Sequence, residues 1–212
     1  MNLSEKHEIL KQPMTQSTSP QRLDGIIKAA CDKLRRDGLN VMQYMEELSW
    51  MLFLKALEAT EENNRARAEF DKKPYVSLIP ETLQWQQWAE NNQYPKRSDN
   101  WRSPVIETAQ MHTHLNHPET GLFKQLSNLK GSSERQKIAQ IFKALGQTRS
   151  KEGATLYDVI REINKIDFHS HDDKFALGKI YEDLLAESGR VGGFSGEFYT
   201  PRPLVRFLWC NA

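Results

Sequence analysis

The chain has 212 residues, a formal net charge of +1, a pI of about 7.8 and a mean hydropathy of −0.69. This length suffices for one sizeable domain with appendages, and the apolar runs are too short for a membrane span or a secretory signal. Dedicated DNA-binding domains often have a pI above about 9, so phosphate contacts would need a local basic face or a partner. Two cysteines, Cys31 and Cys210, form no disulfide framework or zinc set, which favours the cytoplasm.

Residues 1–19 are polar and are expected to form an arm without a core. Ser19 and Pro20 then predict the start of a helix whose apolar positions share one face and which ends at Gly38. Asn40 predicts the N-cap of a long second helix over residues 41–70, apolar on nearly all sides in its middle. We expect these two helices to form an antiparallel hairpin at the centre of a mainly α domain.

The remainder alternates loops with short helical patterns. Residues 71–80 are irregular, although "PYVSLIP" is a candidate strand, and "HPETGLFKQL" (residues 117–126) predicts a loop and turn. Ser133 with Gln136 and Thr155 with Asp158 predict the starts of two later helices. Further helices are predicted over residues 81–92, 105–116, 134–146, 156–166 and 174–189, and the helical domain over residues 20–189.

Charged and histidine-containing clusters offer only weak candidate sites. The basic residues that could contact DNA phosphate are Lys33, Arg35, Arg36, Arg65 and Arg67, although each could equally be solvated at a helix end. His114 and His117 have the spacing of metal ligands on a helix, but solvated side chains are the favoured interpretation, so no metal site is predicted. Trp85, Trp88 and Trp101 are expected in the core, with an interface as the alternative, and no nucleophile or phosphate-loop motif occurs.

The segment "GGFSGEFYTPRPLVRF" (residues 192–207) is different. Thr200 and Pro201 stand where an N-cap and a first helical residue belong, so free backbone N–H groups there would suit a carboxylate or phosphate. Glu197 is placed to accept a hydrogen bond from an ammonium group. The arrangement fits a ligand with an amino-acid moiety, and the alternative is a capped helix that follows a flexible linker.

This segment resembles the Gly-Glu/Gln-aromatic-aromatic-Thr-Pro signature of the modification (methyltransferase) subunit of type I restriction–modification systems. Two other blocks are also similar to that family, "IIKAACDKLRRDGLNVMQYMEELSWMLFLKALEATEE" and "DDKFALGKIYEDLLAESG". The resemblance implies a helical N-terminal domain followed by a Rossmann-like domain that binds S-adenosyl-L-methionine. In the full subunit, the residues expected at the methionine end of this cofactor are Glu197, Phe198, Tyr199, Thr200, Pro201 and Arg202.

The glycine loop that holds the cofactor and the Asn-Pro-Pro-aromatic motif that holds the flipped adenine are not in this sequence. The chain is therefore expected to be truncated before the Rossmann-like catalytic domain, with residues 190–212 as a Gly-rich linker and the first helix of that domain. No catalytic residue is assigned, and we expect no methyl transfer and no S-adenosyl-L-methionine binding by the chain alone.

The resemblance also implies a role and partners. The full subunit would methylate adenine at N6 in specific DNA sites, together with a specificity subunit, a restriction subunit and a second methyltransferase subunit. The helical part would serve subunit assembly and DNA clamping. The alternative is a stand-alone helical interaction module with no role on DNA.

Overall fold

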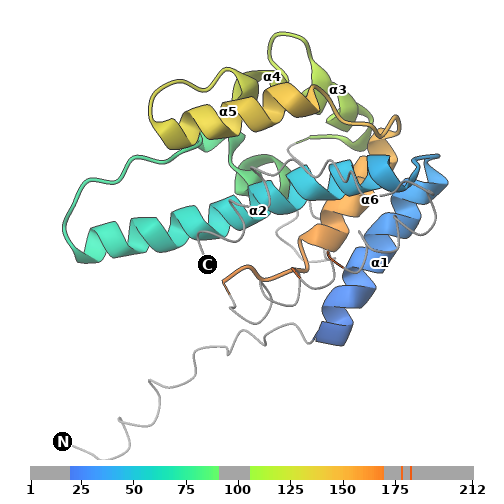
Figure 1. Cartoon of the computed structure of the whole chain (residues 1–212), viewed down its shortest axis with the longest axis horizontal. Helices are drawn as coiled ribbons and strands as arrows, with labels where there is room; N and C mark the ends of the chain where they lie inside the picture. The colour runs from blue at the N-terminus through green and yellow to red at the C-terminus, as the bar shows by residue number, and fades with distance from the viewer. Residues whose placement is uncertain (1–19, 91–105, 170–177, 179–181, 183–212) are drawn as a thin grey trace, which may run out of the picture.

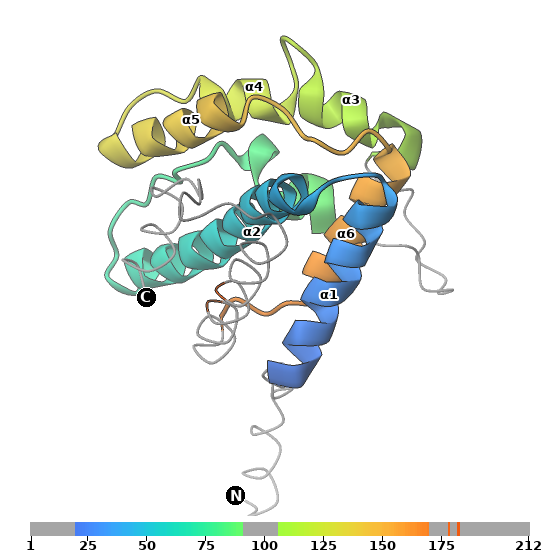
Figure 2. The same ribbon diagram turned by 45° about the vertical axis from the view of Figure 1, so that its right-hand side comes forward.

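The computed structural model describes residues 20–90, 106–169, 178 and 182. Within them the fold consists of helices and loops without strands, which confirms the mainly α prediction. Two groups of helices are visible in Figure 1 and Figure 2. The short helices α3 (Met111–Asn116), α4 (Leu122–Ser127) and α5 (Ser133–Leu145) form a layer over α2 (Val41–Phe70), while α1 (Pro20–Arg36) and α6 (Gly153–Ile163) pack together beside it.

Helix α1 begins at Pro20, as predicted, and turns one apolar face to the core. It ends in a Schellman motif, in which Leu39 N–H donates to the Leu34 carbonyl (3.2 Å) and Gly38 N–H to that of Arg35 (3.1 Å). Gly38 has a φ of +87°, a conformation that glycine adopts without steric cost. Leu39 is buried after this turn, like Leu34, so the chain enters α2 over an apolar contact.

Helix α2 begins with the expected cap and a reciprocal bond besides. The Asn40 side chain accepts from Gln43 N–H, and the Gln43 side chain accepts from Asn40 N–H, both at 3.0 Å. The middle of α2 is buried nearly all round because helices lie on more than one side of it. Beyond Glu61 the helix projects outward, and residues 62–70, here called the α2 arm, are exposed except for the half-buried Ala68.

The expected hairpin of the first two helices is wrong. Helix α1 turns away from α2 after the shared loop and packs along α6 instead, which the periodicity of either helix could not reveal (Figure 2). The contact is closed by an ion pair in which Lys33 Nζ lies 2.6 Å from Glu162 Oε1.

Several local expectations need correction. Residues 74–80 form an irregular coil rather than a strand, and "HPETGLFKQL" contains helix α4. The N-cap of α5 is Ser132, whose hydroxyl accepts from Arg135 N–H at 3.4 Å, and α6 begins at Gly153 without a side-chain cap. The helix expected over residues 81–92 is a 3-10 turn (Glu81–Leu83) followed by a π-helical turn (Gln86–Glu90).

A chain of aromatic rings joins the α3–α5 layer to α2. Phe123 of α4 makes edge contacts with Trp50 of α2, at 5.1 Å between ring centroids, and with Phe142 of α5, at 5.3 Å. Trp88 contacts both Trp50 and Trp85, and all five of these rings are buried. This confirms the prediction that Trp85 and Trp88 lie in the core. Such rings contribute large buried areas, so this cluster is the main apolar connection between the layers.

Candidate functional site

The structure does not bring the five predicted DNA-contacting residues together. Lys33, Arg35 and Arg36 lie in the last turn of α1, whereas Arg65 and Arg67 lie on the α2 arm. The rise of an α-helix places Arg65 about 36 Å along the axis from the start of α2. The two groups therefore belong to opposite ends of α2 (Figure 1).

Within the first group, two cations already have partners in the protein. Lys33 is held by Glu162, and Arg35 pairs with Asp32 at 2.8 Å while its guanidinium lies over the Tyr44 ring at 5.7 Å. Burial raises the pKa of Glu162, but hydrogen bonds from Lys165 and Lys33 outweigh it, so the net pKa is lowered and the carboxylate stays ionised. Arg36 is exposed at the helix end.

The second group makes no ion pair within the part of the chain that the structure describes. Arg65 and Arg67 are both exposed on the α2 arm. The arm ends in another Schellman motif, in which Lys73 N–H donates to the Ala68 carbonyl (2.8 Å) and Lys72 N–H to that of Glu69 (3.0 Å). Lys72 occupies the left-handed position of this motif with a φ of +53°, where glycine is the usual residue.

The segment expected at the cofactor, Glu197 to Arg202, lies outside the described residues.

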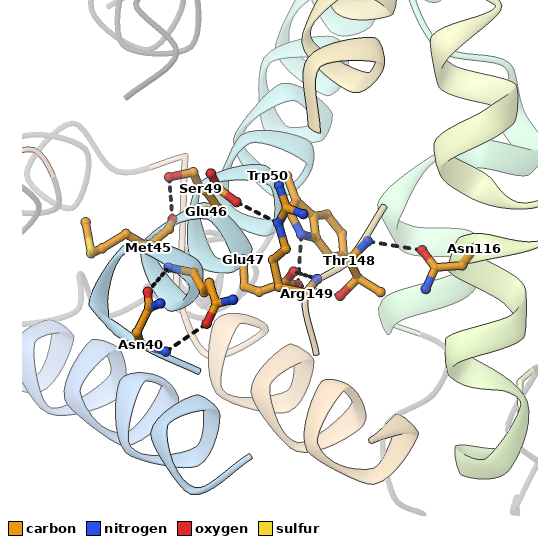
Figure 3. A network of polar contacts seen from close by, with 10 residues as sticks. Asn40, Met45, Glu46, Glu47, Ser49, Trp50, Asn116, Thr148 and Arg149 are labelled. Carbon is orange, nitrogen blue, oxygen red and sulfur yellow. Dashed lines mark hydrogen bonds and ion pairs between the residues drawn. The ribbon is translucent and has the colours of Figure 1, made fainter. Parts of the chain in front are cut away.

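The polar centre that the sequence prediction missed surrounds Glu47 of α2 (Figure 3). This side chain is only 1% exposed and accepts from three groups. Thr148 Oγ1 donates at 2.7 Å and Trp50 Nε1 at 3.1 Å to its Oε2, while the Arg149 backbone N–H donates to its Oε1. The Arg149 guanidinium also pairs with the neighbouring Glu46 at 2.8 Å.

Burial and hydrogen bonding act on Glu47 in opposite directions. Desolvation raises the pKa of its carboxyl group, and the donors from Arg149, Thr148 and Trp50 reduce this shift without cancelling it. The signal in the sequence is a carboxylate on the apolar stripe of a helix, three residues before a tryptophan. A buried carboxylate of this kind needs donors from elsewhere in the fold.

The same network fixes the connection between α5 and α6, residues 147–152, here called the strap. Thr148 N–H donates to Asn116 Oδ1 of α3 at 3.0 Å. Ser150 Oγ and Lys151 N–H both donate to Asp37 Oδ2 in the α1–α2 turn, at 2.5 and 3.2 Å. The strap is thus bound to α2, to α3 and to the turn before α2, and it positions the start of α6.

A second buried carboxylate holds the segment after the α2 arm. Glu61, 4% exposed, accepts from Tyr75 Oη at 2.8 Å, from Leu78 N–H at 3.0 Å and from the Ser77 hydroxyl. Burial, with the hydrogen bond and charge of Glu61, raises the pKa of Tyr75 to about 12. This carboxylate gives the irregular segment a fixed course back toward α5.

Neither buried carboxylate is arranged for acid–base chemistry, because protein donors occupy both. Two of the described histidines also have partners within the protein, since His117 accepts from Thr120 N–H (3.2 Å) and His169 Nε2 lies 3.1 Å from Glu62 Oε2. No group of three or more potential metal ligands occurs in the described ranges. The helices described there also include none long and apolar enough to cross a membrane. Within the described residues, the two buried carboxylates therefore act as acceptors that hold segments of the fold together.

Comparison with known proteins identifies the family of the chain. Residues 23–163 match the HsdM N-terminal domain family. The chain is 30% identical over 191 residues to the type I restriction enzyme EcoEI methylase subunit of Escherichia coli, covering 88% of this chain and 35% of the relative. It is 24% identical over 185 residues to the StySJI methylase subunit of Salmonella typhimurium, covering 84% of this chain and 28% of that relative.

Two solved structures are similar as well. One is described as a modification subunit of a type I restriction enzyme from Vibrio vulnificus YJ016, with 32% identity and a TM-score of 0.65 over 93% of this chain and 40% of that chain. The other comes from work on complex assembly and conformational transition of the type I R-M system, with 33% identity and a TM-score of 0.66 over 90% of this chain and 35% of that chain.

The chain spans about a third of the length of the curated methylase subunits that it matches. Because the family match includes α1 to α6 almost entirely, the helical layers, the Glu47 network and the strap all lie within the matched region. The chain belongs to the family of HsdM N-terminal domains found in type I restriction enzyme methylase subunits.

Proposed function

We propose that this chain acts as the N-terminal domain of a type I methylase subunit, in assembly of the subunits and in clamping on DNA. The observation that carries the proposal is the match of residues 23–163 to the HsdM N-terminal domain family, a range that includes helices α1 to α6 almost entirely. One of the similar structures comes from work on complex assembly in such a system, which supports the assembly role.

The proposed domain plan is an arm over residues 1–19, the helical domain over residues 20–189, and a linker with a first methyltransferase helix over residues 190–212. In the full subunit, Glu197 to Arg202 would bind the methionine end of S-adenosyl-L-methionine, and the product would be N6-methyladenine in specific DNA sites. Partners would be DNA, the specificity and restriction subunits and a second methylase subunit.

DNA binding tests the clamping role directly. The purified chain is titrated with labelled duplex DNA at low and at moderate salt, alone and with the specificity subunit. We expect binding at low salt that weakens as salt rises, because phosphate contacts release counterions. Absence of binding in every combination would remove the DNA role.

Calorimetry with S-adenosyl-L-methionine and a methylation assay complete the test. We expect neither measurable binding nor methyl transfer by the chain alone. Methylated adenine in DNA treated with the purified chain would refute this expectation.

A specific observation supports the second candidate, a helical interaction module without a DNA role. Phe70 at the end of the α2 arm is 88% exposed, and phenylalanine is among the residue types enriched in protein interfaces. Pull-down of the specificity subunit by the wild-type chain but not by Phe70→Ser, with no DNA binding by either, would favour this candidate.

A further inference from the structure

Positive charge in this protein is concentrated in the α3–α5 layer. Residues 20–90 contain twelve carboxylates and ten Lys or Arg residues, whereas residues 111–150 contain two carboxylates and six Lys or Arg residues. The six cations of residues 111–150 are Lys124, Lys130, Arg135, Lys137 and Lys143 in the α3–α5 layer and Arg149 in the strap. The net charge of +1 for the whole chain therefore conceals a basic layer on one side of α2 (Figure 1).

Two of the six cations serve the fold. Arg149 pairs with Glu46, and Arg135 donates to the Ser77 carbonyl at 2.6 Å. The other four, Lys124, Lys130, Lys137 and Lys143, are here called the α4–α5 lysines. All four are exposed, and none forms an ion pair with the described carboxylates.

The nearby carboxylate, Glu134, does not neutralise them. It lies in the first turn of α5, where the pKa of its carboxyl group is lowered first by its own backbone N–H, then by the Ser133 and Ser132 hydroxyls, and least by Lys137. Its carboxylate therefore takes its hydrogen bonds from the first turn of α5. The four ammonium groups remain available to an anionic partner.

The surroundings of these lysines indicate the class of that partner. Apart from Glu134 and Ala144, the neighbouring exposed side chains on α4, α5 and their connection are neutral and polar, namely Gln125, Asn128, Ser132, Ser133, Gln136 and Gln140. The large exposed apolar side chains of the described chain are Met42, Phe70 and Val76, all outside this pair of helices. Protein interfaces rely on apolar or aromatic anchors, whereas a phosphate backbone is bound by lysines with amide and hydroxyl donors.

We propose that the exposed surface of the α4–α5 pair contacts the phosphate backbone of duplex DNA through Lys124, Lys130, Lys137 and Lys143, independently of sequence. The inference rests on the proposed DNA-clamping function and assigns its surface. It differs from the set expected from local basic clusters, in which Lys33 and Arg35 are engaged by Glu162 and Asp32.

The test compares the whole chain with two quadruple variants that remove the same charge. One replaces Lys124, Lys130, Lys137 and Lys143 with Gln, and the matched control replaces Lys28, Lys72, Lys73 and Lys151, all exposed and outside this pair of helices, with Gln. Binding to a labelled duplex is measured by fluorescence anisotropy over a salt series. Thermal unfolding checks that each variant is folded, since substitutions at exposed positions usually change stability little.

We expect the α4–α5 variant to lower the slope of log K against log salt by about 3–4, since each lost phosphate contact removes about 0.9. The control is expected to keep the wild-type slope. Equal losses in the two variants would overturn the surface assignment and leave the DNA role intact. Failure of the wild-type chain to bind at low salt, alone and with the specificity subunit, would instead overturn the proposed function. Equal competition by poly-glutamate would overturn the preference for phosphate.

Discussion

At the scale of single residues, Glu47 concentrates the polar energetics of the fold. Its carboxylate is surrounded by donors from α2 and the strap, of which those of Trp50 and Thr148 are buried and that of Arg149 is partly buried. A buried donor that loses its acceptor costs about 1–3 kcal/mol, so the donors depend on the carboxylate as much as it depends on them.

We predict that Glu47→Ala lowers the free energy of unfolding by about 3 kcal/mol or more, since it leaves Trp50 Nε1, Thr148 Oγ1 and Arg149 N–H without their acceptor. Urea unfolding measures this loss. The control, Glu46→Gln, removes an ion pair of two partly exposed side chains and is expected to change stability by less than about 1 kcal/mol. Similar losses of unfolding free energy in the two variants would show that the buried network stabilises the fold no more than the exposed ion pair does.

The raised pKa of Glu47 predicts a pH dependence of unusual sign for a carboxylate. Because the folded chain binds this proton more tightly than the unfolded chain, the stability it contributes is fully present below the unfolded pKa of about 4.5 and is lost as the pH rises through the folded value. Glu47→Gln cannot lose a proton there. The unfolding free energy of wild type minus that of Glu47→Gln should therefore fall as the pH increases from 4.5 toward neutrality, and a constant difference would contradict the raised pKa.

At the scale of elements, helix ends were the part of the fold that the sequence predicted best. Asn40 and Gly38 carry their signal in their own chemistry, a side-chain acceptor and a missing Cβ, so the bounds of α1 and α2 could be predicted. Helix α4 could not, because six residues after a glycine carry little periodicity and are stabilised by α5 instead. The start of α6 depends on the strap, which no local pattern reveals.

Two glycines allow a direct comparison between the interior of α1, where Gly25 lies, and the turn that ends it, where Gly38 lies. An added Cβ would meet open space at both, but Gly38 has a positive φ and Gly25 is helical. Gly38→Ala is expected to destabilise the chain by about 1 kcal/mol and Gly25→Ala to stabilise it by about 0.5–1 kcal/mol. Thermal unfolding measures both, and changes of the same sign would contradict the Schellman assignment.

The motif that ends α2 makes the converse prediction. Lys72 holds a left-handed conformation in a turn of the same hydrogen-bond pattern, so Lys72→Gly should relieve strain and raise the free energy of unfolding by about 0.5–1 kcal/mol. Lys73→Gly, one residue later and without a positive φ, is the control and should give no increase.

At the scale of the whole molecule, the α3–α5 layer and α2 should unfold as one unit. The contacts between Trp50, Phe123 and Phe142 connect them, and so do the hydrogen bonds of the strap. This arrangement was beyond prediction from sequence. Trp50, Phe123 and Phe142 belong to three different helices, one of which was predicted as a loop, and nothing local in the sequence indicates that their rings meet. The candidate site is affected in the same way, since charge counted by layer, not by short cluster, identifies the α4–α5 lysines.

We predict that Phe123→Ala lowers the free energy of unfolding by about 3–5 kcal/mol, through loss of its contacts with Trp50 and Phe142. Tryptophan fluorescence and far-UV circular dichroism should report the same midpoint in wild type and variant. Phe70→Ala, at an exposed position, should change stability by about 0.5 kcal/mol or less. Separate midpoints for the two probes would contradict a single cooperative unit.

The projection of α2 beyond its buried part has a mechanical consequence. The α2 arm continues without interruption the helix that the core clamps from Tyr44 to Glu61, so no hinge separates Phe70 from Asn40, about 45 Å of helix away. A protein bound at Phe70 would therefore be held at a fixed distance and orientation relative to the helical core. A force applied at Phe70 would be transmitted along α2 toward the Glu47 network, because no flexible linker lies between them.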